Sequence, residues 1–414
     1  MPARPFNSSP PISSPQNKPA RLRLRLRPSV EARVRSGHPW IFSDSIRDQN
    51  REGAAGELAV IFDRKDEFLA LGLYDPDSPI RVRVLHCGKP VNIDTTWWRE
   101  RLKLALDKRA TLFDVRTNGG RWINGESDGF PALVLDRYAN TLVLKLYSTI
   151  WFSRLSEILP LVQEALKPER LVLRLSRNIQ SNAAVHDWRD GRILAGAAPD
   201  GPMQFLETGL CFEADVIKGQ KTGFFLDQRD NRRIVESLAM RRHVLNAFSF
   251  SGGFSLYAAR GGAKSVTDLD ISDHALESSK RNFALNREKV QGCEHRLVQT
   301  DVFEWLQDPS TARFDLVILD PPSLAKRESE RLRALEAYAS LAESAIKLVR
   351  SKGIVLCCSC SAHVRAEEFL QSVTGAAERS RRGFEVLQTT REPVDHHADF
   401  PEAQYLKAIY LRFV

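Results

Sequence analysis

The sequence predicts an α/β protein whose C-terminal half forms a doubly wound sheet of seven strands. From residue 243 onward, apolar strand-like runs alternate with helical segments. Two of these runs end in reactive side chains, an aspartate within 314–322 and a cysteine within 353–361, and open α/β sheets place ligands at the carboxyl ends of their strands. The last two strands, 383–389 and 404–413, follow each other without a helix, so we expect the sheet to close with an antiparallel edge.

The remaining elements of this half are assigned from the same periodicities. A hairpin is expected over 204–217, before the alternating region begins. Apolar runs predict strands at 243–248, 264–270, 295–299, 314–320 and 353–358. Helical spacing predicts helices at 254–260, 273–286, 302–307, 331–350 and 364–377.

Short strands also dominate the region after residue 20. Residues 21–27 alternate arginine with leucine, so a strand would bury three leucines and display four arginines on one face. These arginines are Arg21, Arg23, Arg25 and Arg27. Further strand-like runs, broken by Asp, Gly and Pro, are typical of a small β-barrel and lie at 57–62, 68–73 and 80–85.

Between these two regions lies a mixed α/β segment. It contains expected helices at 97–112 and 151–166 and expected strands at 132–136, 141–147 and 170–175. Residues 1–20 hold six prolines and four serines, a composition that favours disorder. We therefore divide the chain into a disordered tail (1–20), a barrel (21–90), a central α/β domain (91–200) and the C-terminal sheet domain (201–414).

Composition narrows the classes of partner. Seven of the eight net positive charges lie within residues 1–35, which favours a polyanion as partner; a solvated basic tail is the alternative. No apolar run approaches the ~18–20 residues that span a bilayer, so we expect no membrane partner. Six scattered cysteines without a secretory segment indicate a reducing, cytoplasmic location, and no metal site is expected because no second ligand pair accompanies Cys360 and His363.

A set of strand-end features predicts a nucleoside cofactor. A glycine-containing loop over 246–254 follows the first strand, and an acid at Asp270 ends the second, where it can accept ribose hydroxyls. The loop departs from the dinucleotide spacing G-x-G-x-x-G, so S-adenosylmethionine (SAM) fits better; a sheet that merely packs is the alternative. The candidate cofactor residues are Asn246, Phe248, Ser249, Gly252, Asp270, Asp301, Asp320 and Gln228.

Several motifs of the chain resemble those of a known family. They are 37–42 (GHPWIF), 221–229 (KTGFFLDQR), 251–254 (SGGF), Asp320-Pro321-Pro322, Ser359-Cys360-Ser361 and Tyr405-Leu406-Lys407. Over residues 21–414 the chain resembles the bacterial ribosomal RNA large-subunit methyltransferase I family, PUA-domain class I enzymes that methylate cytosine C5. The resemblance implies an N-terminal PUA RNA-binding barrel, a central α/β domain, a Rossmann-like SAM-dependent methyltransferase domain and large-subunit rRNA as partner. Two departures concern base choice: a missing proline after His396, and Ser323 where relatives often carry a larger residue.

The same strand ends suggest covalent chemistry on a pyrimidine. A thiolate at Cys360 adding to cytosine C6 would make C5 nucleophilic, and Asp320 would stabilise the charge that develops on the ring. Taken in isolation, Cys360 would be a small buried residue. Two further functions stay open: the same fold methylating a guanine or adenine nitrogen without a thiol, and a ribosome-associated RNA-binding factor that no longer turns over.

Several residues are candidates for RNA contact. They are Arg21, Arg23, Arg25 and Arg27 on the barrel and Lys221, Arg229, Pro321 and Pro322 near the sheet. The segment with Lys221 and Arg229 could instead form a hairpin and a helix cap, with Asp227 as N-cap. The target base must be flipped out of its stack, since C5 and C6 are approached from the ring face. The target nucleotide is not readable from the sequence, and a homodimer stays open.

Overall fold

The computed structural model describes residues 21–414 except 186 and 309–311. The chain divides into two compact units, Met1–Val91 and Asn92–Val414. The expected disordered tail, 1–20, lies outside the described residues. The central and C-terminal parts belong to one unit, so the boundary near residue 200 stays a division based on sequence.

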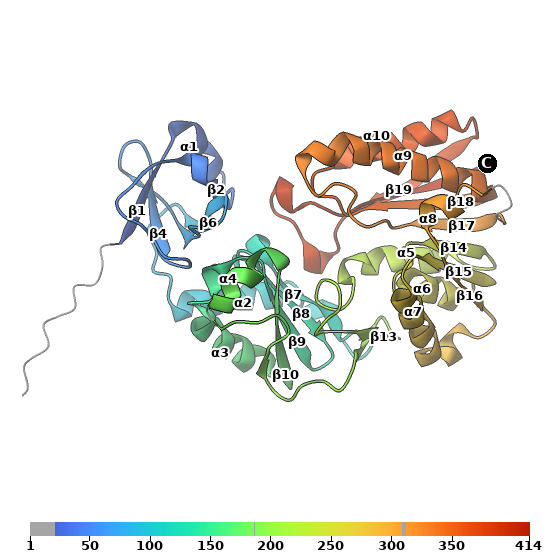
Figure 1. The fold of residues 1–414 in the computed structure, drawn as a ribbon, viewed down its shortest axis with the longest axis horizontal. Helices are drawn as coiled ribbons and strands as arrows, with labels where there is room; N and C mark the ends of the chain where they lie inside the picture. Colours follow the sequence, from blue (N-terminus) through green and yellow to red (C-terminus); the bar gives the residue numbers. More distant parts are fainter. Residues whose placement is uncertain (1–20, 186, 309–311) are drawn as a thin grey trace, which may run out of the picture. The chain divides into compact units, whose positions relative to one another are not determined.

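The N-terminal unit is a six-stranded sheet in the order β2-β6-β5-β4-β1-β3 (Figure 1). The predicted alternation over 21–27 is confirmed, because Leu22, Leu24 and Leu26 are fully buried in its core. A short helix, α1 (Pro28–Arg35), was not predicted; it begins with a proline, whose missing N–H is no loss at a helix start. The strands are β1 (Leu22–Leu26), β2 (Trp40–Phe42), β3 (Ile46–Gln49), β4 (Leu58–Phe62), β5 (Phe68–Tyr74) and β6 (Ile80–Cys87).

The second unit begins with a five-stranded sheet in the order β11-β10-β9-β8-β7. Two helices, α2 (Thr95–Asp107) and α3 (Leu155–Leu166), pack with it, and Asp94 caps α2 by accepting a hydrogen bond from the Trp97 amide at 3.0 Å. A short helix, α4 (Gln180–Val185), follows β10. The strands are β7 (Gly119–Asn124), β8 (Leu133–Tyr138), β9 (Thr141–Leu146), β10 (Arg170–Leu175) and β11 (Ile193–Ala195), of which β7 and β11 were not predicted. The predicted hairpin is present as β12 (Met203–Glu207) and β13 (Leu210–Ala214).

The C-terminal sheet has the seven predicted strands, in the order β16-β15-β14-β17-β18-β20-β19. They are β14 (His243–Ala247), β15 (Ser265–Asp270), β16 (Glu294–Gln299), β17 (Phe314–Leu319), β18 (Val349–Ser359), β19 (Phe384–Thr390) and β20 (Lys407–Phe413). The predicted antiparallel edge is confirmed: β19 is the edge strand and pairs antiparallel with β20, which lies between β18 and β19. Burial explains the order of these two strands: almost every residue of β20 is buried, whereas β19 has no buried residue and suits the edge.

Helices cover both faces of this sheet (Figure 1). One face packs against α5 (Arg229–Leu238), α6 (Gly253–Arg260) and α7 (Asp273–Leu285). The other packs against α8 (Val302–Trp305), α9 (Arg331–Leu348) and α10 (Ala366–Arg379). Alternate residues of β17 point to opposite faces of the sheet. Leu316 and Ile318 pack on the face covered by α5, α6 and α7, and Val317 and Leu319 pack on the face covered by α8, α9 and α10. Within the described residues, no helix combines the length and apolar character needed to cross a membrane.

Candidate functional site

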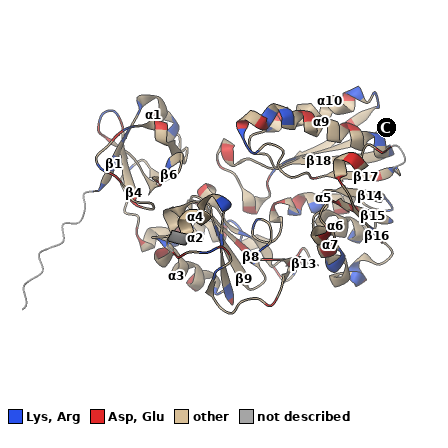
Figure 2. Ribbon diagram, in the orientation of Figure 1, with Lys and Arg blue, Asp and Glu red and all other residues tan. Residues whose placement is uncertain are grey.

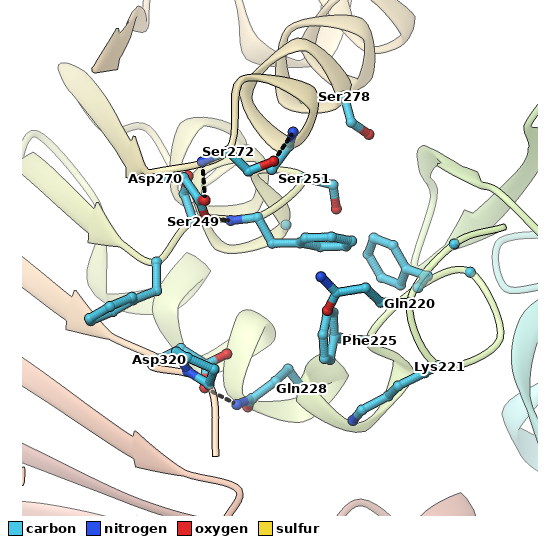
Figure 3. A pocket seen from close by; sticks show the side chains of 18 of the residues that line it. Gln220, Lys221, Phe225, Gln228, Ser249, Ser251, Asp270, Ser272, Ser278 and Asp320 are labelled. Carbon is cyan, nitrogen blue, oxygen red and sulfur yellow. Dashed lines mark hydrogen bonds between the residues drawn. The ribbon is translucent and has the colours of Figure 1, made fainter. Parts of the chain in front are cut away.

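A cavity of about 520 Å³ opens at the carboxyl ends of β14, β15, β17 and β18. This size suits a nucleoside cofactor together with part of a second substrate. The segment before α5 forms its other wall (Figure 3). Nine of the sequence-predicted site residues line the cavity: Lys221, Gln228, Phe248, Ser249, Asp270, Asp320, Pro321, Pro322 and Cys360.

The loop after β14 takes an unusual backbone path. Phe248, Phe250 and Gly252 all have left-handed backbone conformations, with φ of 61°, 47° and 71°. At Gly252 a Cβ would come within 2.0 Å of the Ser279 hydroxyl oxygen, so only glycine fits. Gly252 itself does not line the cavity; it lets α6 begin at Gly253, which does line it. Its role is thus to aim the start of this helix at the cavity.

Asn246 lies beneath this loop rather than in the cavity. Its side chain is fully buried and its Nδ2 donates to the Asp268 carboxylate at 3.0 Å and to the Ser255 hydroxyl at 3.1 Å. Because its Nδ2 is used by these two groups and Asn246 is not among the lining residues, the side chain supports the loop and does not face the cavity.

Two predicted acids have different positions. Asp270 accepts the Phe250 and Ser272 amides, each at 2.9 Å, and these bonds fix its carboxylate at the cavity wall. In Figure 3, Asp270 lies with Ser249 and Ser272 on one side of the cavity. Asp301 instead caps α8 by accepting the Phe303 and Glu304 amides at 2.7 and 3.2 Å, and it is not among the lining residues. Of these two acids, only Asp270 lines the cavity.

Asp320 and Cys360 both line the cavity, next to the Asp-Pro-Pro turn. The Asp320 carboxylate accepts a hydrogen bond from Gln228 Nε2 at 2.9 Å (Figure 3). Burial, followed by the nearby Asp227 charge, raises the pKa of Asp320 to about 7. Burial and the charge of Asp320 raise the pKa of Cys360 to about 11, an increase that Lys221 opposes. The Cys360 sulfur lies 4.0 Å from the Pro321 carbonyl oxygen, which places the thiol beside the Asp-Pro-Pro turn.

Lys221 is held by a carboxylate and aromatic rings. Its Nζ lies 2.5 Å from Asp227 Oδ2 and 4.6 Å from the Phe225 ring centroid. Tyr405 donates to the same Asp227 oxygen at 2.7 Å. Asp227 therefore does not cap α5, which has no side-chain cap. From the sequence we expected Asp227 only as a cap, although the Lys221 to Asp227 spacing within one motif was a signal that the two could pair.

Arg229 does not reach the cavity. The residue is 2% exposed, and its guanidinium forms a bidentate pair with Asp395, at 2.9 and 3.0 Å. The Arg121 amide also donates to Asp395, which joins the strand β7 to the C-terminal segment. We therefore correct the prediction that Arg229 contacts RNA: the side chain has a structural position, and sequence reasoning could not find its partner 166 residues away.

The predicted arginine face of the N-terminal unit is partly neutralised. Arg21, Arg23 and Arg27 are exposed, whereas Arg25 pairs with Asp66 at 2.8 Å and lies 3.9 Å from Asp48. Basic and acidic positions both occur along this unit in Figure 2. The unpaired basic charge on β1 is thus smaller than the sequence alone suggests. Among the described residues, no group of three or more His, Cys, Asp or Glu side chains could hold a metal ion.

Comparisons with known proteins agree with this architecture. A family described as S-adenosylmethionine-dependent methyltransferase matches residues 171–412, and a PUA-like domain matches 24–86. Two solved structures show the same fold at 20 and 21% identity, with TM-scores of 0.81 and 0.82; both cover 94% of this chain and 99% of the other. One is described as a SAM-dependent methyltransferase from Streptococcus mutans, and the other was solved with S-adenosylhomocysteine.

Relatives of higher identity name the family. A ribosomal RNA large subunit methyltransferase of Deinococcus radiodurans is 54% identical and covers 97% of this chain and all of the relative. A ribosomal RNA large subunit methyltransferase I of Tolumonas auensis is 34% identical and covers 91% of this chain and 96% of the relative. The fixed Asp270 carboxylate and the start of α6 suit the cofactor, which is SAM. The chain belongs to the SAM-dependent ribosomal RNA large subunit methyltransferase family.

Proposed function

We propose that this protein methylates C5 of a cytosine in large-subunit rRNA, through a transient bond between Cys360 and the base. The observation that carries the proposal is that a thiol, Cys360, and an acid of raised pKa, Asp320, line the same cavity as the cofactor acid Asp270. The names of the relatives at 54 and 34% identity support large-subunit rRNA as the substrate.

The chemistry requires the thiol because cytosine C5 is a poor nucleophile. The Cys360 thiolate adds to C6, and the electron pair of the C5–C6 bond becomes available at C5. When bound, SAM supplies the methyl group as an electrophilic carbon, and S-adenosylhomocysteine leaves. Transfer of the C5 proton to water then restores the C5–C6 double bond and expels the Cys360 sulfur as a thiolate, ready for the next addition.

Asp320 assists addition by stabilising the charge that develops on the ring. With a pKa of about 7, its carboxyl is protonated often enough near neutral pH to donate to N3 as the sulfur adds. Lys221 contributes a positive charge that favours the Cys360 thiolate over the thiol. Pro321 and Pro322 provide a rigid wall beside a base that has been flipped from its stack.

The rival on the same fold, methylation of a ring or exocyclic nitrogen, would need no thiol. The residue after the Asp-Pro-Pro turn, Ser323, donates its hydroxyl hydrogen to the Ala325 carbonyl at 3.1 Å and does not line the cavity. Ser323 is therefore not positioned to select a base, and the distinction between the two reactions depends on Cys360.

The test is mass spectrometry of 23S rRNA nucleosides from cells that lack the gene. We expect loss of one 5-methylcytidine, restored by the wild-type gene and by Cys211→Ala, but not by Cys360→Ala. Cys211 is the matched control because it is a partly exposed thiol on the hairpin, away from the cavity. A missing methylguanosine or methyladenosine, restored by Cys360→Ala, would favour the nitrogen-directed reaction. Failure of the purified protein to bind SAM in calorimetry would instead favour a non-catalytic RNA-binding factor.

A further inference from the structure

Asp227 presents one carboxylate oxygen that has no partner. The side chain is 3% exposed and lines the cavity. Its Oδ2 is satisfied by Lys221 and Tyr405, whereas Oδ1 is buried without a hydrogen-bond partner among the described residues. A buried carboxylate oxygen that lacks a donor is costly, and such a group at a cavity wall is commonly completed by a ligand.

The partners of Asp227 determine its charge. Although burial favours the neutral form, the Lys221 ammonium at 2.5 Å and the nearby His396 hold the pKa of Asp227 below its ordinary value. An ionised carboxylate can only accept hydrogen bonds. The free oxygen therefore requires an N–H or O–H group on whatever enters the cavity.

Asp227 lies near the residues proposed to react with the base. The next residue in the chain, Gln228, donates to Asp320 at 2.9 Å, and the Asp227 charge contributes to the raised pKa values of both Asp320 and Cys360. The two carboxyl groups differ in kind: Asp227 is an acceptor, and Asp320 can carry a proton and donate. One end of the cavity thus offers an acceptor and a donor beside the thiol.

We propose that Asp227 Oδ1 accepts a hydrogen bond from the exocyclic amine of the target cytosine while Asp320 faces ring N3, so that Asp227 determines the choice of cytosine over uracil. This inference rests on the proposed function. Cytosine presents an amine donor next to the N3 acceptor, which matches the acceptor and donor of the two carboxyl groups. Uracil presents the reverse order, so its O4 would face the Asp227 carboxylate and its N3–H would face a protonated Asp320. The contact between uracil O4 and the Asp227 carboxylate is repulsive, and leaving buried polar groups unpaired in this way is a strong basis for rejection.

Asp227 Oδ1 could also accept a hydrogen bond from a different amine, the amino group at the methionine end of SAM. The two possible donors, the cytosine amine and the cofactor amine, are distinguished by what a substitution at Asp227 changes. If the ligand is the cofactor amine, Asp227→Asn weakens SAM binding; if it is the base, SAM binding is kept and base choice changes. Measurement of both quantities on the same variant separates them.

The experiment compares Asp227→Asn with wild type on 23S rRNA transcripts that carry cytidine or uridine at the mapped target position. The introduced amide can keep its oxygen toward Lys221 and Tyr405 and turn its NH₂ group toward the base, where it repels the cytosine amine and suits uracil O4. We expect the cytidine-to-uridine ratio of kcat/KM to fall by at least about tenfold, with the SAM dissociation constant unchanged. The matched control is Asp230→Asn, which removes one acid from the exposed side of the same segment and should keep the wild-type ratio.

A second measurement uses the wild-type protein and so does not depend on the folding of a variant. A transcript with pyrimidin-2-one at the target position lacks only the exocyclic amine, and because a thiolate adds to this base more readily than to cytosine, its initial binding is measured before the covalent adduct forms. We expect this initial binding to weaken by at least about tenfold. The inference is overturned if Asp227→Asn keeps the ratio, if it raises the SAM dissociation constant by a similar factor, or if the amine-free base binds as well as cytosine. These outcomes leave the proposed function intact, because that proposal fails only if the product is not 5-methylcytidine or if Cys360→Ala is active.

Discussion

Arg229 and Asp395 form a buried bidentate ion pair, with N···O distances of 2.9 and 3.0 Å, between the helix that borders the cavity and the C-terminal segment. Asp395 also accepts the Arg121 amide of the central sheet at 3.1 Å. Three stretches of chain that lie far apart in the sequence are thus joined at one carboxylate. The pair holds the start of α5 to the C-terminal segment, and neither residue lines the cavity.

Arg229→Ala should destabilise the fold by about 3–5 kcal/mol, because it leaves the Asp395 carboxylate buried without its cation. The unfolding midpoint in urea measures this effect. Arg233→Ala removes an exposed arginine from the same helix and should change stability by less than about 0.5 kcal/mol. A stable Arg229→Ala protein with weakened RNA binding would contradict the structural role and favour the contact predicted from the sequence.

Asp320→Asn should make stability less dependent on pH. Burial, then Asp227, raises the folded pKa of Asp320 from 3.8 to about 7. Between these values the folded state keeps a proton that the unfolded state releases, so the stability from the protonated carboxyl is complete below 3.8 and is lost as pH rises to about 7. The melting temperature of the wild type should therefore fall relative to that of Asp320→Asn between about pH 4 and pH 7 and not further above it. Parallel pH curves for the two proteins would refute the raised pKa.

Cys360 should react slowly with iodoacetamide near neutral pH, because burial and then Asp320 hold its pKa at about 11. Two substitutions should change the alkylation rate in opposite directions. Asp320→Asn removes a negative charge and should speed the reaction, whereas Lys221→Met removes the opposing positive charge and should slow it. Peptide mass spectrometry follows Cys360, with the buried Cys358 as an unreactive internal reference. The same direction for both variants would show that access, and not charge, controls the thiol.

The arginines of β1 should contribute unequally to RNA affinity. Removal of the exposed Arg23 or Arg27 should each reduce the slope of log affinity against log salt by about one. Arg25→Ala should reduce it less, because Asp66 already pairs with this guanidinium at 2.8 Å. Filter binding to 23S rRNA fragments over a range of salt concentrations measures the slopes. Equal reductions for all three variants would mean that Arg25 leaves Asp66 when RNA binds.

The sequence by itself determined the local elements and the strand ends that line the cavity. Periodicity two over 21–27 was sufficient to assign buried leucines, and the order of strand ends was sufficient to predict that the loop after β14, Asp270, Asp320 and Cys360 lie around one cavity. These features are local, because alternation sets which side chains are buried and parallel strands bring their carboxyl ends to one edge.

Only the tertiary structure decided how distant side chains pair. It showed that β20 lies inside the sheet, that Arg229 is buried in an ion pair with Asp395, and that Asp301 caps a helix. It also left one oxygen of Asp227 at the cavity wall without a hydrogen-bond partner in the part of the chain that the structure describes. The physical reason is that charge pairing and desolvation depend on which segments meet across the fold, and the spacing of residues along the chain does not contain that information.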